Sequence, residues 1–282
     1  MEKTIVGLLG PNGAGKTSLI RIINQITMQD AGDVYFDGKL LAPNDVEHIG
    51  YMPEERGLYK SMKVGEQALY LAQLKGLSKS EAKKRLKYWF DKFDISAWWD
   101  KKIEELSKGM AQKVQFIVTV MHKPKLLIFD EPFSGFDPIN AQLIAKEILQ
   151  LRDEGATIIF STHRMESVEE MCDYIALIDQ SNKILEGKLD DIKRAFRTNT
   201  FQVGVATSNP KEVEERLRQL YKVSTADFKI INEGLKLNIT LKEGENPNDL
   251  LSFLTSQGHV QHFVELVPDA NEIFMQAVNK NI

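Results

Sequence analysis

Short, nearly continuous apolar runs alternate along this chain with longer stretches in which apolar residues recur every three or four positions. The runs Ile5–Leu9, Lys125–Asp130 and Thr157–Ser161 are typical of strands buried in a parallel sheet. Between and after these runs, apolar residues recur at the spacing of a helix face. The segments that show this spacing are Leu19–Ile26, Val64–Lys75, Ser80–Phe93, Ala111–Met121 and Met165–Met171. This alternation predicts an α/β fold with a parallel core sheet, and a helical subdomain inserted at about residues 60–121.

The pattern changes after a predicted hairpin of strands Tyr174–Ile178 and Lys183–Glu186. Beyond it we expect the strand Phe201–Ala206, the helix Lys211–Leu220, the strands Phe228–Ile231 and Leu235–Leu241, the helix Pro247–Gln257 and the strand Val260–Leu266. This βαββαβ order predicts a small α+β domain of the ferredoxin-like type, followed by a helix over Ala270–Ala277. The predicted domains are therefore residues 1–197 and 198–282.

The strongest local motif lies between the first predicted strand and the first predicted helix. Gly10-Pro11-Asn12-Gly13-Ala14-Gly15-Lys16-Thr17 fits the phosphate-binding P-loop pattern G-x-x-x-x-G-K-[ST]. Its backbone N–H groups and the following helix N-terminus can cradle phosphate oxygens. Lys16 can reach the β- and γ-phosphates of a nucleotide, and the Thr17 hydroxyl can ligate Mg²⁺.

Polar residues also end the other two buried strands. Asp130 can hold Mg²⁺ directly or through water, and Glu131 can polarise an attacking water. His163, after Thr157–Ser161, can contact a γ-phosphate. The plainer alternatives are an ordinary strand-to-turn exit at Asp130 and Glu131, and a residue next to a helix N-cap at His163.

Composition narrows the possible classes of protein. A net charge of −4 over 282 residues argues against a dominant nucleic-acid-binding surface. The single cysteine, Cys172, permits no internal disulfide, and we expect it to be a packed thiol. No apolar run approaches bilayer length and no signal peptide is evident, so any membrane role is expected to come through a partner.

Taken together, the motifs resemble those of the ATP-binding subunits of ABC transporters. Leu106-Ser107-Lys108-Gly109-Met110 resembles the signature motif, usually LSGGQ, and Leu127–Glu131 resembles Walker B. Ser134–Asp137 resembles the D-loop, and His163 resembles the switch histidine. The stretch Tyr51–Tyr59 is similar to a bacterial export branch that includes sodium-extrusion ATPases.

The resemblance implies a Mg²⁺-dependent ATPase that drives export through a separate integral membrane permease at the cytoplasmic face of the membrane. ATP would lie between two cassettes, in a homo- or heterodimer, with no nucleic-acid partner. By resemblance, the nucleotide would be bound by Pro11, Asn12, Gly13, Ala14, Gly15, Lys16, Thr17 and Ser18, and by Ser107 and Gly109 of a second subunit. Thr17, Asp130 and Glu54 would surround Mg²⁺, with Glu131 and His163 as catalytic residues.

Three departures from the family pattern bear on these expectations. Glu54 stands where the family usually has Gln, and the signature carries Lys108 and Met110. The family also has two strands and an adenine-stacking aromatic residue before the P-loop strand, whereas only four residues precede Ile5. This late start predicts weak ATP binding, because base–aromatic stacking contributes about 1–3 kcal/mol.

The family places a groove for the permease in the helical subdomain, and Leu58, Tyr59 and Met62 are candidates for its floor. The lysine-rich segment 79–87 predicts either a docking patch or, more simply, a solvated helix face. Two other functions remain open: a nucleotide-binding regulatory module with little turnover, and a soluble ABC ATPase that acts on ribosomes or DNA.

Overall fold

The chain folds into two compact units. The computed structural model describes residues 3–55, 57–229 and 234–279. The first unit ends at Leu189 and takes in the chain from Ala277 onward, and the second unit is Asp190–Gln276. The sequence predicts the boundary between the two domains after residue 197, eight residues beyond Leu189, and that division stays a proposal.

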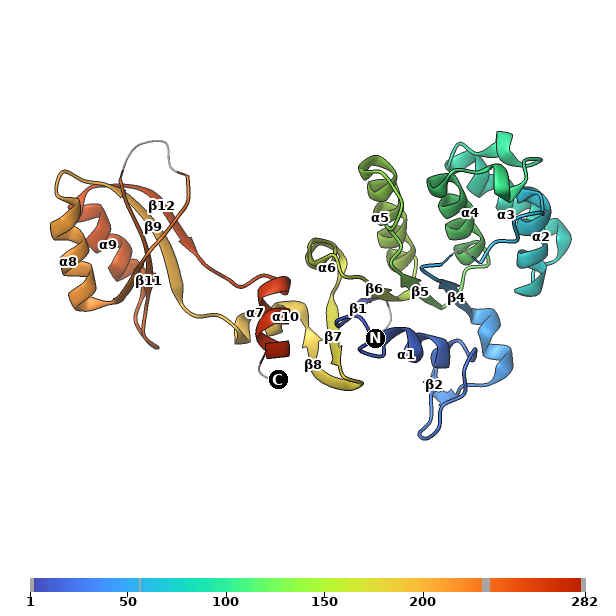
Figure 1. The fold of residues 1–282 in the computed structure, drawn as a ribbon, viewed down its shortest axis with the longest axis horizontal. Coiled ribbons are helices and arrows are strands. Elements are labelled where there is room, and N and C mark those ends of the chain that lie inside the picture. Colours follow the sequence, from blue (N-terminus) through green and yellow to red (C-terminus); the bar gives the residue numbers. More distant parts are fainter. Residues whose placement is uncertain (1–2, 56, 230–233, 280–282) are drawn as a thin grey trace. The chain divides into compact units, whose positions relative to one another are not determined.

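A six-stranded sheet forms the core of the first unit, in the order β4-β5-β6-β1-β7-β8 (Figure 1). Its strands are β1 (Ile5–Leu9), β4 (Ile49–Met52), β5 (Leu126–Asp130), β6 (Thr157–Ser161), β7 (Tyr174–Asp179) and β8 (Asn182–Lys188). Neighbouring strands are parallel except β7 and β8, which form the predicted antiparallel hairpin. The three apolar runs are therefore confirmed as central parallel strands.

Helices cover both faces of this sheet (Figure 1). On one face lies α1 (Lys16–Ile23), whose Ile20 packs with Leu8 and Ile128. On the other lie α5 (Pro138–Asp153) and α6 (Met165–Met171). The first helix ends three residues before the predicted limit, because Gln25 has a left-handed backbone with φ 55°. The remaining short elements of this part are β2 (Tyr35–Phe36), β3 (Lys39–Leu40) and 3₁₀ turns at Pro43–His48, Ser96–Trp98 and Ile103–Glu105.

Three helices occupy the segment predicted to be helical: α2 (Val64–Leu74), α3 (Lys79–Lys92) and α4 (Lys108–Val120). Aromatic rings join them to the sheet. Trp89 of α3 meets Phe116 of α4 edge-on at 6.2 Å between centroids, and Phe116 stacks on Phe129 of β5 at 5.7 Å. This chain of rings anchors the helical segment to the core, since such pairs add to the stabilisation from apolar burial.

The second unit contains an antiparallel sheet in the order β10-β11-β9-β12. The elements from Leu189 onward are α7 (Leu189–Ala195), β9 (Thr200–Ala206), α8 (Pro210–Leu220), β10 (Lys222–Thr225), β11 (Leu235–Thr240), α9 (Pro247–Gln257), β12 (His259–Glu265) and α10 (Ala270–Asn279). Side chains such as Val205, Leu217 and Leu254 form its buried core. The βαββαβ order and the central position of β9 confirm the ferredoxin-like prediction.

One predicted strand of this unit is wrong. The strand that precedes β11 and pairs with it is Lys222–Thr225, and the described part of the predicted strand, Phe228 and Lys229, lies outside any strand. The Phe228 ring instead lies against that of His262, with the centroids 4.4 Å apart and the planes tilted by 34°, and the Phe228 carbonyl accepts a hydrogen bond from Lys236 Nζ at 2.6 Å. Residues 230–233, which include the end of the predicted strand and most of the predicted turn, lie outside the described residues.

The two ends of the ferredoxin-like sheet meet. Arg197, just before β9, forms a bidentate pair with Glu265 at the end of β12: Nε donates to Oε1 at 2.6 Å and Nη2 donates to Oε2. The N–H of Leu266 donates to the carbonyl of Thr200 at 2.7 Å. The chain therefore enters and leaves this sheet at neighbouring points.

Cys172 is buried at the end of α6, as expected for a packed thiol. Burial raises the pKa of its thiol to about 12. Within the described residues, none of the helices has the length and apolar character needed to cross a bilayer.

Candidate functional site

The P-loop connects β1 to α1. Gly15, with φ 104°, is the N-cap of α1 and supplies no capping side chain, so the first-turn N–H groups face the loop without a side-chain acceptor. The Lys16 ammonium folds back to donate to the carbonyls of Gly10 at 2.7 Å and Pro11 at 3.0 Å. This arrangement places the cation and the positive end of the helix at one point.

A pocket of about 480 Å³ opens beside this loop. It is lined by Asn12, Gly13, Ala14, Gly15, Lys16, Thr17, Ser18, Glu54, Asp130, Glu131, Ser161 and His163. The structure therefore brings together most of the candidate residues, from four separate segments. Pro11 does not line the pocket and contributes its carbonyl to Lys16 instead.

Ser161 is a lining residue that the sequence reasoning did not select. It ends β6 directly opposite Asp130 in the parallel register of β5 and β6. The signal that could have found it is its place at the carboxyl end of a strand, next to Thr162 and His163, because ligands bind at that edge of an α/β sheet.

The Glu131 carboxylate is fixed by the end of β6. Its Oε1 accepts a hydrogen bond from the His163 backbone N–H at 2.7 Å and lies 2.7 Å from His163 Nδ1. Thr162 Oγ1 donates to Oε2 at 3.2 Å. Glu131 also has a left-handed backbone with φ 49°, which is rare for a residue other than glycine and is typical of functional sites. Glu131 is thus both a strand exit and a positioned carboxylate.

Asp130 is 6% exposed, and burial raises the pKa of its carboxyl above the usual value. The Ser161 side chain and Lys16 oppose this shift, whereas the carboxylates of Glu54 and Glu131 add to it. Three acidic groups thus face the pocket with a single lysine, and a divalent cation would relieve their repulsion.

The donor set suits Mg²⁺ that arrives with a nucleotide. Among the described residues, no group of three or more His, Cys, Asp or Glu side chains is arranged to hold a metal. Mg²⁺ ordinarily takes one or two carboxylates, and phosphates and waters supply its other ligands. The Thr17 hydroxyl and Asp130, with Glu54 across the pocket, fit that requirement.

The signature residues lie apart from this pocket, since neither Ser107 nor Gly109 lines it. Ser107 is the N-cap of α4, where its hydroxyl accepts a hydrogen bond from the Met110 N–H at 3.3 Å. The Lys108 side chain covers Gly135 of the D-loop so closely that a Cβ there would lie 2.3 Å from Lys108 Cε. The expected action of Ser107 and Gly109 on a second subunit's nucleotide stays a prediction.

Known proteins resemble this chain in both of its parts. A family model described as "ABC transporter" matches residues 1–134, and one described as "ATP-binding protein DrrA1-3-like, C-terminal domain" matches residues 187–278. A Bacillus subtilis protein named "Uncharacterized ABC transporter ATP-binding protein YhaQ" is 39% identical over 277 residues, which cover 98% of this chain and 90% of that protein. The chain belongs to the ABC transporter ATP-binding proteins.

Other similarities agree with this membership. The B. subtilis "Linearmycin resistance ATP-binding protein LnrL" is 36% identical to this ABC ATP-binding protein over 66% of the chain and 61% of its own length. A solved structure titled "Structure of ATP binding subunit of ABC transporter" superposes with a TM-score of 0.64 and 32% identity, over 69% of this chain and 82% of its own. A model for an AAA domain, described as a putative AbiEii toxin of a type IV toxin–antitoxin system, also matches residues 102–169.

These comparisons confirm the predicted family and the P-loop α/β fold class. Domains of this family bind ATP, and the relatives of this ABC ATP-binding protein include resistance and lantibiotic-transport proteins.

Proposed function

We propose that this chain hydrolyses Mg²⁺-ATP and couples the reaction to export through a separate membrane permease. The observation that carries the proposal is Glu131, a carboxylate held at the edge of the P-loop pocket by two contacts with His163. A fixed carboxylate beside a phosphate cradle is what activation of a hydrolytic water requires.

In this mechanism each residue acts on the nucleotide through position and charge. The P-loop N–H groups and Lys16 bind the phosphates, and Ser18 binds near the α-phosphate. When bound, Mg²⁺ would neutralise charge that develops on the phosphates; Thr17, Asp130 and Glu54 would hold it. Oε1 of Glu131 carries both 2.7 Å contacts with His163, whereas Oε2 accepts only the longer 3.2 Å bond from Thr162, so we assign Oε2 to take the proton from water.

Ser107 and Gly109 act from a second ATP-binding subunit. Their position outside the pocket of their own chain supports this assignment, as does the exposure of Ser107 at the N-terminus of α4. ATP bound between two subunits would stabilise a closed dimer, and hydrolysis would remove that stabilisation. This cycle would drive the permease from the cytoplasmic face of the membrane.

Phosphate release from ATP by the full chain tests the proposal. We expect turnover with Mg²⁺ and none after chelation with EDTA, since the pocket carboxylates repel phosphate when no cation is present. ATP binding without phosphate release, with and without a permease, would favour the regulatory module. Association with ribosomes or DNA in place of a membrane protein would favour the soluble class. The likeness to sodium-extrusion ATPases concerns the branch of the family and names no exported substrate, which the permease would select.

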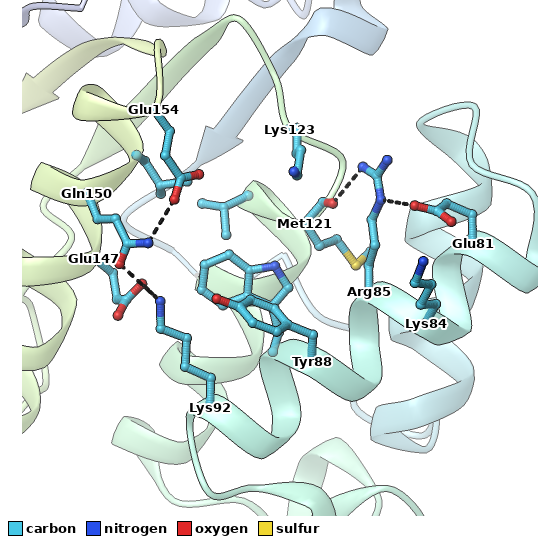
Figure 2. A pocket seen from close by; sticks show the side chains of 13 residues that line it. Glu81, Lys84, Arg85, Tyr88, Lys92, Met121, Lys123, Glu147, Gln150 and Glu154 are labelled. Carbon is cyan, nitrogen blue, oxygen red and sulfur yellow. Dashed lines mark hydrogen bonds and ion pairs between the residues drawn. The ribbon is translucent and has the colours of Figure 1, made fainter.

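A groove on the helical side of this unit is our candidate for the permease docking site. It encloses about 370 Å³ between α3, the residues that follow α4, and the C-terminal half of α5 (Figure 2). Trp89, Met121 and Leu151 form its apolar part. The floor residues expected from the sequence, Leu58, Tyr59 and Met62, are not among those that line it.

The two ends of the groove differ in charge. At one end Lys92 of α3 donates to Glu147 of α5 at 2.6 Å, and Gln150 donates to Glu154 at 2.7 Å (Figure 2). At the other, Lys84 and Lys123 lie near the Arg85–Glu81 ion pair. Neither lysine forms an ion pair within the described ranges of the chain, so this end has excess positive charge. We propose that a permease segment with an apolar side chain and a carboxylate docks here.

Charge reversal at this end should weaken docking. We expect Lys84→Glu with Lys123→Glu to reduce co-purification of the co-expressed permease by about tenfold, because like charges would face each other across the contact. Lys83→Glu with Lys87→Glu is the matched control, since it makes the same change in charge on lysines that flank Lys84 in α3 but do not line the groove. Equal loss in both double variants would contradict the assignment and indicate a diffuse charge effect.

A further inference from the structure

The turn between β7 and β8 has an unfavourable backbone for its sequence. Asp179 pairs with Asn182 across the hairpin, which leaves a two-residue turn of Gln180 and Ser181. Both have positive φ, 46° and 64°. Such turns favour Asn and Gly at these positions, because other side chains are strained there. Strain of this kind persists where the surrounding structure holds it in place.

What holds this turn is the P-loop. The Ser181 N–H donates to the carbonyl of Ala14 at 3.0 Å. The approach is close along the whole contact: a Cβ on Gly10 would lie 2.1 Å from the Ile178 carbonyl oxygen, and one on Gly15 would lie 3.4 Å from Ser181 Oγ. The parallel pairing of β1 with β7 brings Leu9 opposite Leu177, so the two strands that lead into the P-loop and into the turn are already side by side.

This hydrogen bond has a consequence on the pocket side of the loop. The carbonyl of Ala14 and the N–H of Gly15 belong to one peptide unit, and in a trans peptide these two groups point in opposite directions. A carbonyl fixed toward Ser181 therefore turns the Gly15 N–H away from the hairpin. Gly15 lines the nucleotide pocket, so its N–H is turned toward the space for phosphate oxygens.

We propose that the Gln180-Ser181 turn is a nucleotide-positioning element, in which Ser181 acts as a positioning residue that orients the Ala14–Gly15 peptide for phosphate binding. The inference rests on the proposed nucleotide binding and adds a part of the chain outside the P-loop to it. Ser181 touches no phosphate itself. Its effect should appear in affinity for nucleotide and not in the chemical step.

Two leucine variants test this role. Ser181→Leu places a larger side chain against Gly15 and should weaken ATP binding about tenfold, with kcat at saturating ATP within about twofold of wild type. Gln180→Leu is the matched control, because it puts the same side chain in the same strained turn at a residue that, unlike Ser181, does not supply the atoms nearest to a Cβ on Gly15. It should leave affinity within about twofold. Ser181→Gly, which keeps the N–H, should also preserve affinity.

Equal ATP affinity in the two leucine variants would overturn the proposal, as would a fall in kcat alone. Hydrogen exchange of the wild-type chain gives a test that needs no variant. The Ser181 amide should exchange more slowly when ATP is added, and the Gln180 amide should not change. An unchanged Ser181 rate in a protein that binds ATP would contradict the inference, whereas failure of the wild type to bind ATP would contradict the proposed function itself.

Discussion

Replacing Glu131 with Gln is expected to lower ATP turnover by about 10²- to 10⁴-fold, which is the usual contribution of a general base. The amide keeps the size of the side chain and can still accept from the His163 N–H through its oxygen, so the pocket should keep its shape. It cannot take a proton from water. ATP should therefore bind as before, and single-turnover measurements should show loss of the chemical step.

Glu54→Gln is the matched control for this prediction. It makes the same chemical change on another carboxylate of the pocket, and Gln is the residue that the family usually has at this position. We expect it to keep turnover within about tenfold of wild type. Near-normal hydrolysis by Glu131→Gln would remove Glu131 from the catalytic role, and a comparable loss in both variants would indicate a general electrostatic effect.

Replacing Lys16 with Ala is expected to weaken ATP binding by about 100-fold, which is about 2.7 kcal/mol. Among the described residues that line the pocket, Lys16 is the one lysine or arginine, and it stands against three carboxylates. Its removal also leaves the carbonyls of Gly10 and Pro11 without the ammonium that binds them. Affinity for ATP should therefore fall for two reasons: the positive charge is lost, and the P-loop is no longer held by the Lys16 ammonium.

Titration with ATP measures this loss. The control is Lys183→Ala, which removes an exposed lysine paired with Glu186 in the β8 strand. Exposed pairs of this kind contribute about 0–1 kcal/mol to stability, and this one lies outside the pocket. Affinity of the Lys16 variant within threefold of wild type would show that the phosphates are held mainly by backbone N–H groups.

The core of the site could be predicted because its residues follow buried strands. The apolar runs that end at Leu9, Asp130 and Ser161 are neighbours in one parallel sheet, so their carboxyl ends meet at one edge. The P-loop pattern then assigned Lys16 to that edge, and the polar residues that follow the other two runs assigned Glu131 and His163 to it. The sequence could not predict the direct contact of Glu131 with His163, because it depends on a left-handed backbone at a position that carries no glycine.

Features that depend on tertiary packing could not be predicted from the sequence. The segments Lys222–Thr225 and Phe228–Ile231 both have residues suited to strands, and only the register against β11 decides between them. The groove of Figure 2 depends on Lys92 and Glu147, which lie 55 residues apart in the sequence and meet only when α3 packs beside α5. No local pattern contains that contact.

The ion pair of Arg197 with Glu265 suggests how the C-terminal unit could have been acquired. A module whose entry and exit points are adjacent can be inserted into or removed from a host chain with little distortion, because the host has only to bridge a short gap. Here the adjacent points are those of the unit's sheet, since Arg197 and Glu265 both lie inside the unit Asp190–Gln276. Exchange of this module between related cassettes would replace the C-terminal unit and leave unchanged the six-stranded sheet that carries the P-loop pocket.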